Sequence, residues 1–151
     1  MNIKTRSGLL LALLLLVNTT LKAAGDYTSQ AAIEKTVMLG SDTNQLRFYP
    51  STLSFETGKL YKLVIKNPSP QKHYFSASEF SRSIFTRKVQ VMSQQNAVIA
   101  EVKGNIHELE VYPGGTTEWW FVALKTLTHS ALHCSIAGHR EAGMRARISI
   151  K

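Results

Sequence analysis

The 151-residue sequence contains a single cysteine, Cys134, so no disulfide can form within the chain. A small scaffold held together by disulfides is thereby excluded, and the fold must depend on an ordinary hydrophobic core. Hydrophobic residues make up 44% of the chain and charged residues 19%, a balance typical of a globular protein and not of a disordered one. A lone thiol is a liability in an oxidising compartment, which favours metal ligation for Cys134 over the alternative of an inert buried cysteine.

Long runs of charge or of apolar residues are also missing. The basic residues are scattered and form no run of five or six, which argues against a nucleic-acid partner although the formal net charge is +8. The apolar run from Leu9 to Val17 is much shorter than the roughly 20 residues of a spanning helix. We therefore expect no stable membrane insertion.

The first 24 residues have the three-part form of a secretory signal peptide. Lys4 and Arg6 precede the apolar run, and a short polar stretch with small residues ends at Ala23 and Ala24. We expect cleavage near Ala23 or Ala24 and a periplasmic or secreted protein; an N-terminal membrane anchor is the alternative. No cysteine directly follows the apolar run, which excludes a lipid-modified anchor. Removal of this segment would lower the net charge from +8 to +5, because it carries three basic residues and no acid.

Short apolar or alternating segments separated by turn residues predict a β-structure for residues 25–151, which we expect to form one domain. The expected strands are 46–55, 60–66, 106–112, 117–124, 131–134 and 146–150. Their number and spacing predict an all-β fold, a two-sheet antiparallel sandwich. Trp119 and Trp120 are adjacent, so one is expected in the core and the other outside. Residues 77–105 fit this pattern poorly and predict a short helix, starting near Ser78, or an irregular insertion.

Three potential metal ligands lie close together near the end of the chain. Cys134, His139 and Met144 follow a Cys-x4-His-x4-Met spacing, and a glycine precedes both the histidine and the methionine. A thiolate, an imidazole and a thioether form a soft donor set that suits copper cycling between Cu(I) and Cu(II). The glycines allow one loop to turn tightly enough to place all three around one ion. The alternative is a coincidental spacing with Met144 in the core.

A second imidazole would complete a site with two histidines and one cysteine. His73 is the best candidate, because it follows a Pro-Ser-Pro turn at the end of an expected strand. The alternative is a loop histidine beside a proline turn. We expect His107 to be solvated and His129 and His133 to lie at the surface, where an adventitious second metal site is a minor possibility.

The residues from Phe48 to Asn67, followed by His73, resemble the front half of a cupredoxin, the family of type 1 blue copper proteins such as plastocyanin and azurin. Residues Cys134–Met144 resemble its back half, and residues 77–105 have no counterpart in the resemblance. The resemblance implies a Greek-key sandwich that holds one copper ion. It also implies equatorial ligands at His73, Cys134 and His139, and a weak axial ligand at Met144.

The ending also resembles the last domain of multicopper oxidases, which carry a His-Cys-His triplet. Here Ser135 replaces the second histidine, while His133 remains. Alternation along a strand would direct His133 away from the side that Cys134 faces. We therefore expect that the protein has no oxidase activity and is not an enzyme. An open copper position for a small molecule is also disfavoured, because Met144 would fill it.

Two functions remain open. The first is one-electron transfer by a monomer that binds a redox partner protein transiently. Electrons would then enter and leave through His139, which is surrounded by small or apolar residues of its loop. The second is copper tolerance or delivery in the exported compartment. A tract of methionine or histidine residues would favour copper handling, and none is present, so electron transfer is the preferred hypothesis.

Overall fold

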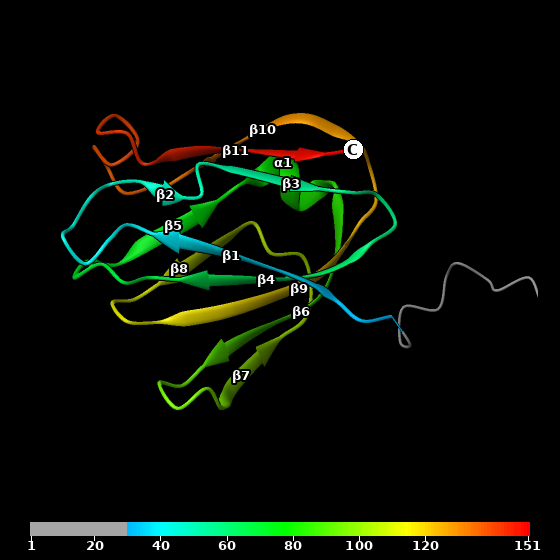
Figure 1. Cartoon of the computed structure of the whole chain (residues 1–151), viewed down its shortest axis with the longest axis horizontal. Helices are drawn as coiled ribbons and strands as arrows, with labels where there is room; N and C mark the ends of the chain where they lie inside the picture. Colours follow the sequence, from blue (N-terminus) through cyan, green and yellow to red (C-terminus); the bar gives the residue numbers. More distant parts are fainter. Residues whose placement is uncertain (1–29) are drawn as a thin grey trace, which may run out of the picture.

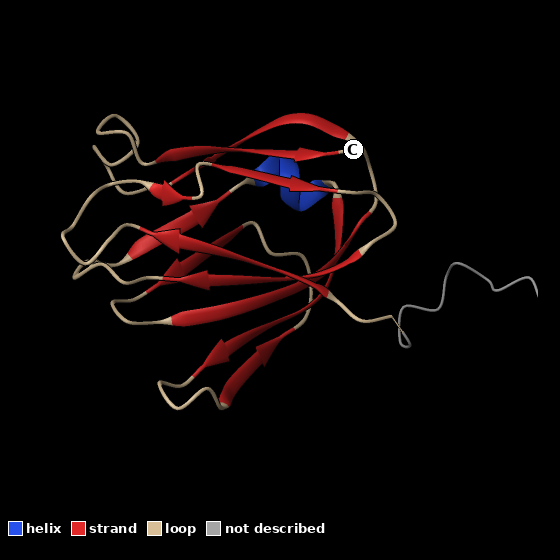
Figure 2. Ribbon diagram, viewed as in Figure 1, coloured by secondary structure: helices blue, strands red, loops and turns tan. Residues whose placement is uncertain are grey.

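The computed structural model describes residues 30–151, and the predicted signal peptide lies outside the described residues. These residues form two β-sheets packed face to face, with one short helix (Figure 1, Figure 2). The elements in chain order are β1 (Ile33–Leu39), β2 (Phe48–Tyr49), β3 (Thr52–Phe55), β4 (Leu60–Lys66), β5 (His73–Ser76), α1 (Ser78–Arg82), β6 (Ile84–Met92), β7 (Val98–Val102), β8 (Glu108–Val111), β9 (Thr116–Ala123), β10 (Leu127–His133) and β11 (Arg145–Ile150). No helix among residues 30–151 is long and apolar enough to cross a membrane.

The predicted two-sheet sandwich is confirmed. One sheet has six strands in the order β2-β1-β4-β9-β6-β7, and the other has five in the order β3-β11-β10-β5-β8. The chain repeatedly crosses from one sheet to the other. Segment 46–55, expected as one strand, divides at the Tyr49–Pro50 bond, so that β2 joins the first sheet and β3 the second.

The sheets are mixed, which corrects the prediction that they are purely antiparallel. Strand β1 runs parallel to β4, and β3 runs parallel to β11, while the other pairs are antiparallel. Parallel neighbours need a crossover connection, and the path from β1 to β4 through β3 in the opposite sheet supplies one. Strand β1 was not expected from the sequence, since only Val37 and Leu39 of its residues are buried.

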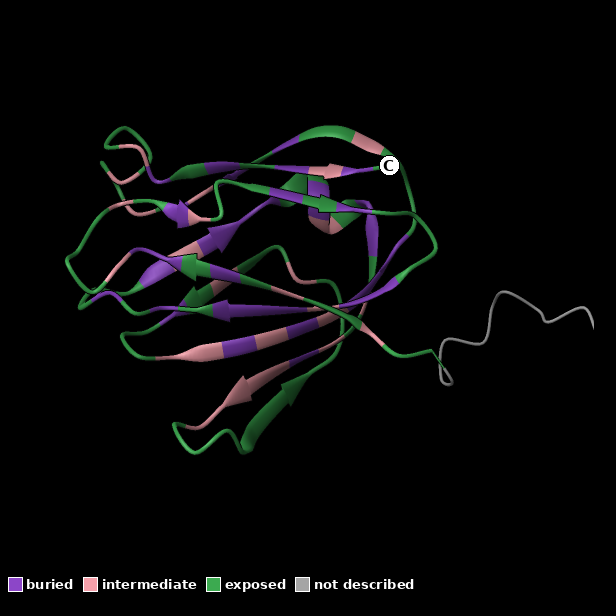
Figure 3. Cartoon of the chain, viewed as in Figure 1, coloured by how far each residue is buried: buried purple, intermediate pink, exposed green. Residues whose placement is uncertain are grey.

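Buried residues are distributed over the strands of both sheets (Figure 3). Aromatic side chains fill one part of the core that these residues form. The rings of Phe55, Phe80 and Phe121 lie 5.2–5.3 Å apart, within the range of favourable aromatic pairing. Trp119 is fully buried against Phe80, whereas Trp120 is half-buried on the other face of β9. This confirms that the two tryptophans face opposite sides of the sheet.

Residues 77–105 contain a short helix, as expected, followed by a β-hairpin. Helix α1 buries Phe80, and strands β6 and β7 extend the first sheet. Every residue of β7 is exposed, because it forms the edge of that sheet and packs against no other layer. A strand without a buried face lacks the alternation by which strands are recognised, which explains the weak signal.

Candidate metal centre

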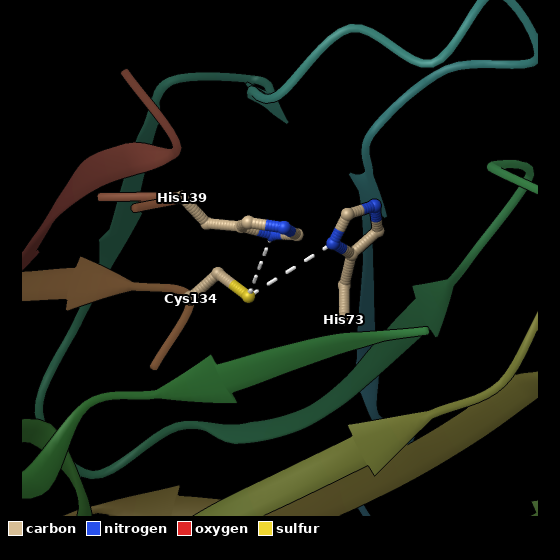
Figure 4. A group of neighbouring side chains, drawn as sticks. All are labelled: His73, Cys134 and His139. Carbon is tan, nitrogen blue, oxygen red and sulfur yellow. Dashed lines mark hydrogen bonds between the residues drawn. The ribbon is translucent and has the colours of Figure 1, made fainter. Parts of the chain in front are cut away.

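His73, Cys134 and His139 meet at one end of the sandwich, although His73 is far from the others in sequence. His73 is the first residue of β5, Cys134 directly follows β10, and His139 lies in the loop that leads to β11. The three potential ligand atoms all lie within 4.8 Å of one another. Figure 4 shows both imidazole rings directed toward the cysteine sulfur. The structure thus brings together three of the four residues proposed from sequence as metal ligands.

The distances within this group are those of a metal site. Cys134 Sγ lies 3.9 Å from His73 Nδ1 and 3.6 Å from His139 Nδ1. A first-row metal ion such as zinc binds sulfur at about 2.3 Å and imidazole nitrogen at about 2.0 Å, so a trigonal arrangement separates the two donors by about 3.7 Å. One thiolate, two imidazoles and a nearby methionine are the donor set of a type 1 copper site. The residues present therefore fit such a site.

His73 is held in the neutral form that a metal ligand requires. Its side chain is completely buried, and burial, followed by repulsion from His139, lowers the pKa of His73 from 6.5 to about 4. On the other side of the ring, Nε2 lies 3.1 Å from Ser69 Oγ. A proton on Nε2 donated to this hydroxyl leaves the Nδ1 lone pair directed at the site, the usual role of groups behind a ligating histidine.

Cys134 is buried and its sulfur accepts a hydrogen bond from the backbone. The Tyr74 N–H donates to Cys134 Sγ over 3.4 Å, the kind of contact by which surrounding groups hold and orient a ligating atom. Tyr74 directly follows His73, so the same strand supplies one imidazole and one donor to the sulfur. A shift of β5 would therefore disturb both.

The loop from Cys134 to Met144, here called the ligand loop, is closed by its own backbone. Cys134 N–H donates to the Met144 carbonyl over 3.2 Å, and Met144 N–H donates to the His139 carbonyl over 2.9 Å. Gly138 and Gly143 have φ angles of 82° and 107°, which residues with a side chain rarely adopt. The glycines thus have the role expected from the sequence. The loop leaves His139 half-buried and the Met144 side chain fully buried, and the axial role of Met144 stays a prediction.

Sequence reasoning missed the residues that support His73. The buried Asn67 side chain donates to the carbonyls of Gln71 and Val111 and accepts from the Ser69 N–H, which shapes the turn that leads to His73. A Cβ added to Gly40 would lie 3.0 Å from His73 Nε2 and 3.0 Å from Ser69 Cβ. The Asn-Pro-Ser-Pro sequence marked the turn, but no local signal marks Gly40.

The other histidines lie outside this group. His107 and His129 are exposed, as predicted. His133 is half-buried in β10, opposite Arg145 of β11. Burial alternates from the buried Leu132 through His133 to the buried Cys134, which is consistent with the expectation that His133 faces away from the site.

Similarity to known proteins is found by comparing structures and not by comparing sequences. No family model matches the chain, and a search of curated proteins finds no significant match. Among solved structures, the McoA multicopper oxidase from the hyperthermophile Aquifex aeolicus matches 81% of this chain and 30% of its own length, at 16% identity and a TM-score of 0.58. The chain therefore spans about a third of that oxidase.

Two further structures are similar over most of this chain. Reduced auracyanin from the photosynthetic bacterium Roseiflexus castenholzii matches 81% of this chain and 99% of its own length, at 15% identity and a TM-score of 0.50. Copper nitrite reductase from Nitrosomonas europaea matches 80% of this chain and 48% of its own length, at 9% identity and a TM-score of 0.53. At these identities the likeness shows the fold alone, and that fold is cupredoxin-like.

Proposed function

We propose that this protein binds one copper ion at His73, Cys134 and His139, with Met144 as a weak axial ligand, and carries single electrons between redox partners. The observation that carries the proposal is the buried His-Cys-His group, whose sulfur-to-nitrogen distances of 3.6 and 3.9 Å match a trigonal metal site. Its occurrence at one end of a cupredoxin-like sandwich supports copper over other metals.

A bound copper ion would supply a one-electron Cu(I)/Cu(II) couple. The chain contributes a stiff frame, because all three donors are attached to strands or to the backbone-closed ligand loop. The Tyr74 N–H stabilises negative charge on the sulfur, and Ser69 holds the His73 ring in place. A fixed ligand geometry limits rearrangement between the two oxidation states, which favours fast electron transfer.

His139 is the part of the site nearest to solvent. It is half-buried, whereas His73, Cys134 and Met144 are fully buried. The loop around it presents Ile136, half-buried, and Ala137 and Gly138, both exposed. Small, uncharged residues suit a brief contact with a redox partner, so we propose His139 as the point where electrons enter and leave.

We propose a carrier and not an enzyme. Substrate chemistry needs an open coordination position, and the buried Met144 would occupy the axial one. Ser135 also replaces the second histidine of the His-Cys-His triplet that the resemblance to multicopper oxidases would require. Export to the periplasm or outside the cell, as a monomer, is part of the same proposal. Copper tolerance or delivery through the same ligands is the alternative.

The direct test is copper addition to the purified protein spanning residues 25–151. We expect an intense visible absorption band from thiolate-to-copper charge transfer and a type 1 electron spin resonance signal. Cys134→Ser should abolish both, whereas Ser135→Ala, a change at the exposed neighbouring residue, should leave both intact. A colourless copper-treated protein would refute the site.

Voltammetry of the copper-loaded protein then separates the two functions. A reversible one-electron couple supports the carrier, and its absence contradicts it. Deletion of the gene provides the second measurement. A respiratory defect at ordinary copper supports electron transfer, whereas a growth defect only at high copper supports copper handling.

A further inference from the structure

A wide groove lined by cationic side chains lies beside the ligand loop, on the face of the second sheet that points away from the core. It has a volume of about 840 Å³, and we call it the arginine groove. Its lining residues are Ser51, Thr52, His129–His133, Arg140 and Arg145–Arg147. In Figure 1, strands β10 and β11, which form its floor, run from the ligand loop along the top of the molecule.

Strand alternation gathers the charges on this face. In β11, Arg145 and Arg147 are exposed while Ala146 between them is buried. In β10, His133 lies directly opposite Arg145, and Ala131 lies opposite Arg147. The small Ala131 side chain leaves a hollow between longer neighbours, which explains why this face forms a groove and not a flat surface.

The three arginines of the groove form no ion pair with the residues that the structure describes. Among the described residues, ion pairs join Lys62, Lys72, Lys88 and Lys103 to glutamates, and none of these pairs involves Arg140, Arg145 or Arg147. No aspartate or glutamate lines the groove, and Glu141 lines a neighbouring hollow instead. Two guanidinium groups on one face of β11, with no carboxylate lining the groove, make this part of the surface electropositive.

One polar atom of the groove residues also lacks a partner. His133 Nδ1 is buried from solvent, and no atom in the described part of the chain forms a hydrogen bond with it. An unsatisfied buried polar atom costs free energy.

We propose that the arginine groove binds an extended acidic segment of a partner protein. Arg145 and Arg147 are two residues apart on one strand, about 7 Å along the chain. Carboxylates at alternate positions of an extended segment have the same spacing, so each could pair with one guanidinium in the two-bond geometry that arginine favours. A single small anion would fill little of 840 Å³. A concave surface without large exposed apolar side chains does not suit a membrane.

The position of the groove gives this binding a consequence for the metal centre. Arg140 lines the groove and directly follows His139 in the ligand loop. A partner with its acidic segment in the groove would therefore lie next to the half-buried imidazole. The placement of the partner beside the His139 imidazole matters only if the proposed electron transfer is correct, and so rests on the proposed function. Binding of the acidic segment itself does not require copper.

The test uses a synthetic peptide of four Glu-Ser repeats with blocked ends, titrated into the protein at low ionic strength. We expect saturable binding that weakens with added salt, with amide chemical-shift changes concentrated in residues 129–133 and 145–147. The double variant Arg145→Gln with Arg147→Gln should bind about tenfold more weakly or worse.

The matched control changes two exposed lysines to glutamine, Lys59 and Lys125. These lie in the β3–β4 and β9–β10 connections, at the opposite end of the sandwich from the ligand loop (Figure 1). The control has the same net charge as the arginine variant and should bind the peptide as the unaltered protein does. Equal weakening in both variants would show a response to net charge alone and would overturn the proposal.

Two further outcomes would also overturn it. Inorganic phosphate that displaces the peptide at equal ionic strength would indicate a small-anion site. Phosphatidylserine vesicles that bind the protein while the peptide does not would indicate a membrane surface. The titration is repeated on copper-treated protein, with its visible spectrum recorded. Loss of the absorption band then reports on copper binding, independently of whether the peptide binds the arginine groove.

Discussion

At the scale of single residues, Gly40 influences the proposed site without being a ligand. It lies just after β1 with a φ of 78°, and its backbone packs against the His73 ring and Ser69. A side chain here would meet Nε2 of His73 on the side opposite the metal. Gly40 therefore sets the position of an imidazole that belongs to a different sheet.

We predict that Gly40→Ala weakens copper binding by about tenfold or more, in the range found for groups that support a ligand. Gly58→Ala is the matched control, because Gly58 has a φ of 72° but nothing within 4 Å of an added Cβ. Both variants should lose about 1 kcal/mol of stability through backbone strain, as measured by urea unfolding. A competition titration with a copper chelator measures affinity, and equal affinities for the two variants would contradict the role of Gly40.

At the scale of elements, helix α1 is too short to be stable alone and depends on a single buried side chain. Phe80 is its only buried residue and packs against Phe55, Trp119 and Phe121. The Phe80 N–H also donates a hydrogen bond to the Ser130 hydroxyl oxygen of β10 over 3.2 Å. No side chain caps the N-terminus of the helix. The helix is therefore held by tertiary contacts and not by local propensity.

We predict that Phe80→Ala destabilises the protein by about 3–5 kcal/mol, because it leaves a cavity in the aromatic core. Phe85→Ala, at a position 58% exposed in the next strand, should cost less than about 1 kcal/mol. Urea unfolding monitored by tryptophan fluorescence measures both. Similar losses in the two variants would show that the Phe80 cluster does not anchor this part of the core.

At the scale of the whole molecule, the buried His73 ties global stability to pH. Its pKa is about 4 in the folded chain and about 6.5 when exposed, so between these values the unfolded chain binds more protons. Protonation therefore favours unfolding as the pH falls. The stability associated with neutral His73 is fully present above pH 6.5 and is lost progressively as the pH falls to about 4.

We predict that the metal-free protein loses about 3 kcal/mol of unfolding free energy between pH 7 and pH 4 through His73 alone. His73→Gln removes this group, so its stability should depend less steeply on pH than that of the unaltered protein. His107→Gln, at an exposed position, should preserve the original slope. Urea unfolding at a series of pH values measures the three slopes, and identical slopes would contradict a buried neutral His73.

The basic residues of the two sheets differ in whether they form ion pairs. Lysines of the first sheet pair with glutamates, as Lys62 does with Glu34 and Glu118. The arginines beside the ligand loop have no such partners within the described residues. Three positive charges without an ion-pair partner among the described residues thus lie near the candidate site, which is the arrangement expected of a surface that attracts an acidic partner.

The sequence by itself determined the chemistry of the candidate site and most strands of the sandwich. Cys134, His139 and Met144 could be identified together because one loop holds them, and spacing within a loop is a local property. Strand β4, buried on both faces, was recognisable as an apolar run, and β9, largely buried on one face, by its alternation. The fully exposed β7 and the mostly exposed β1 lacked that imprint.

Only the tertiary structure decided which distant segments meet. The parallel pairing of β1 with β4 and the position of Gly40 behind His73 both depend on contacts between residues far apart in the chain. Pairing between strands is selected by the packing of the whole sandwich, and no local pattern encodes it. His73 shows both sides of this division: its residue type and preceding turn suggested a ligand, and the pairing of β5 with β10 in the second sheet brought its Nδ1 within 3.9 Å of Cys134 Sγ.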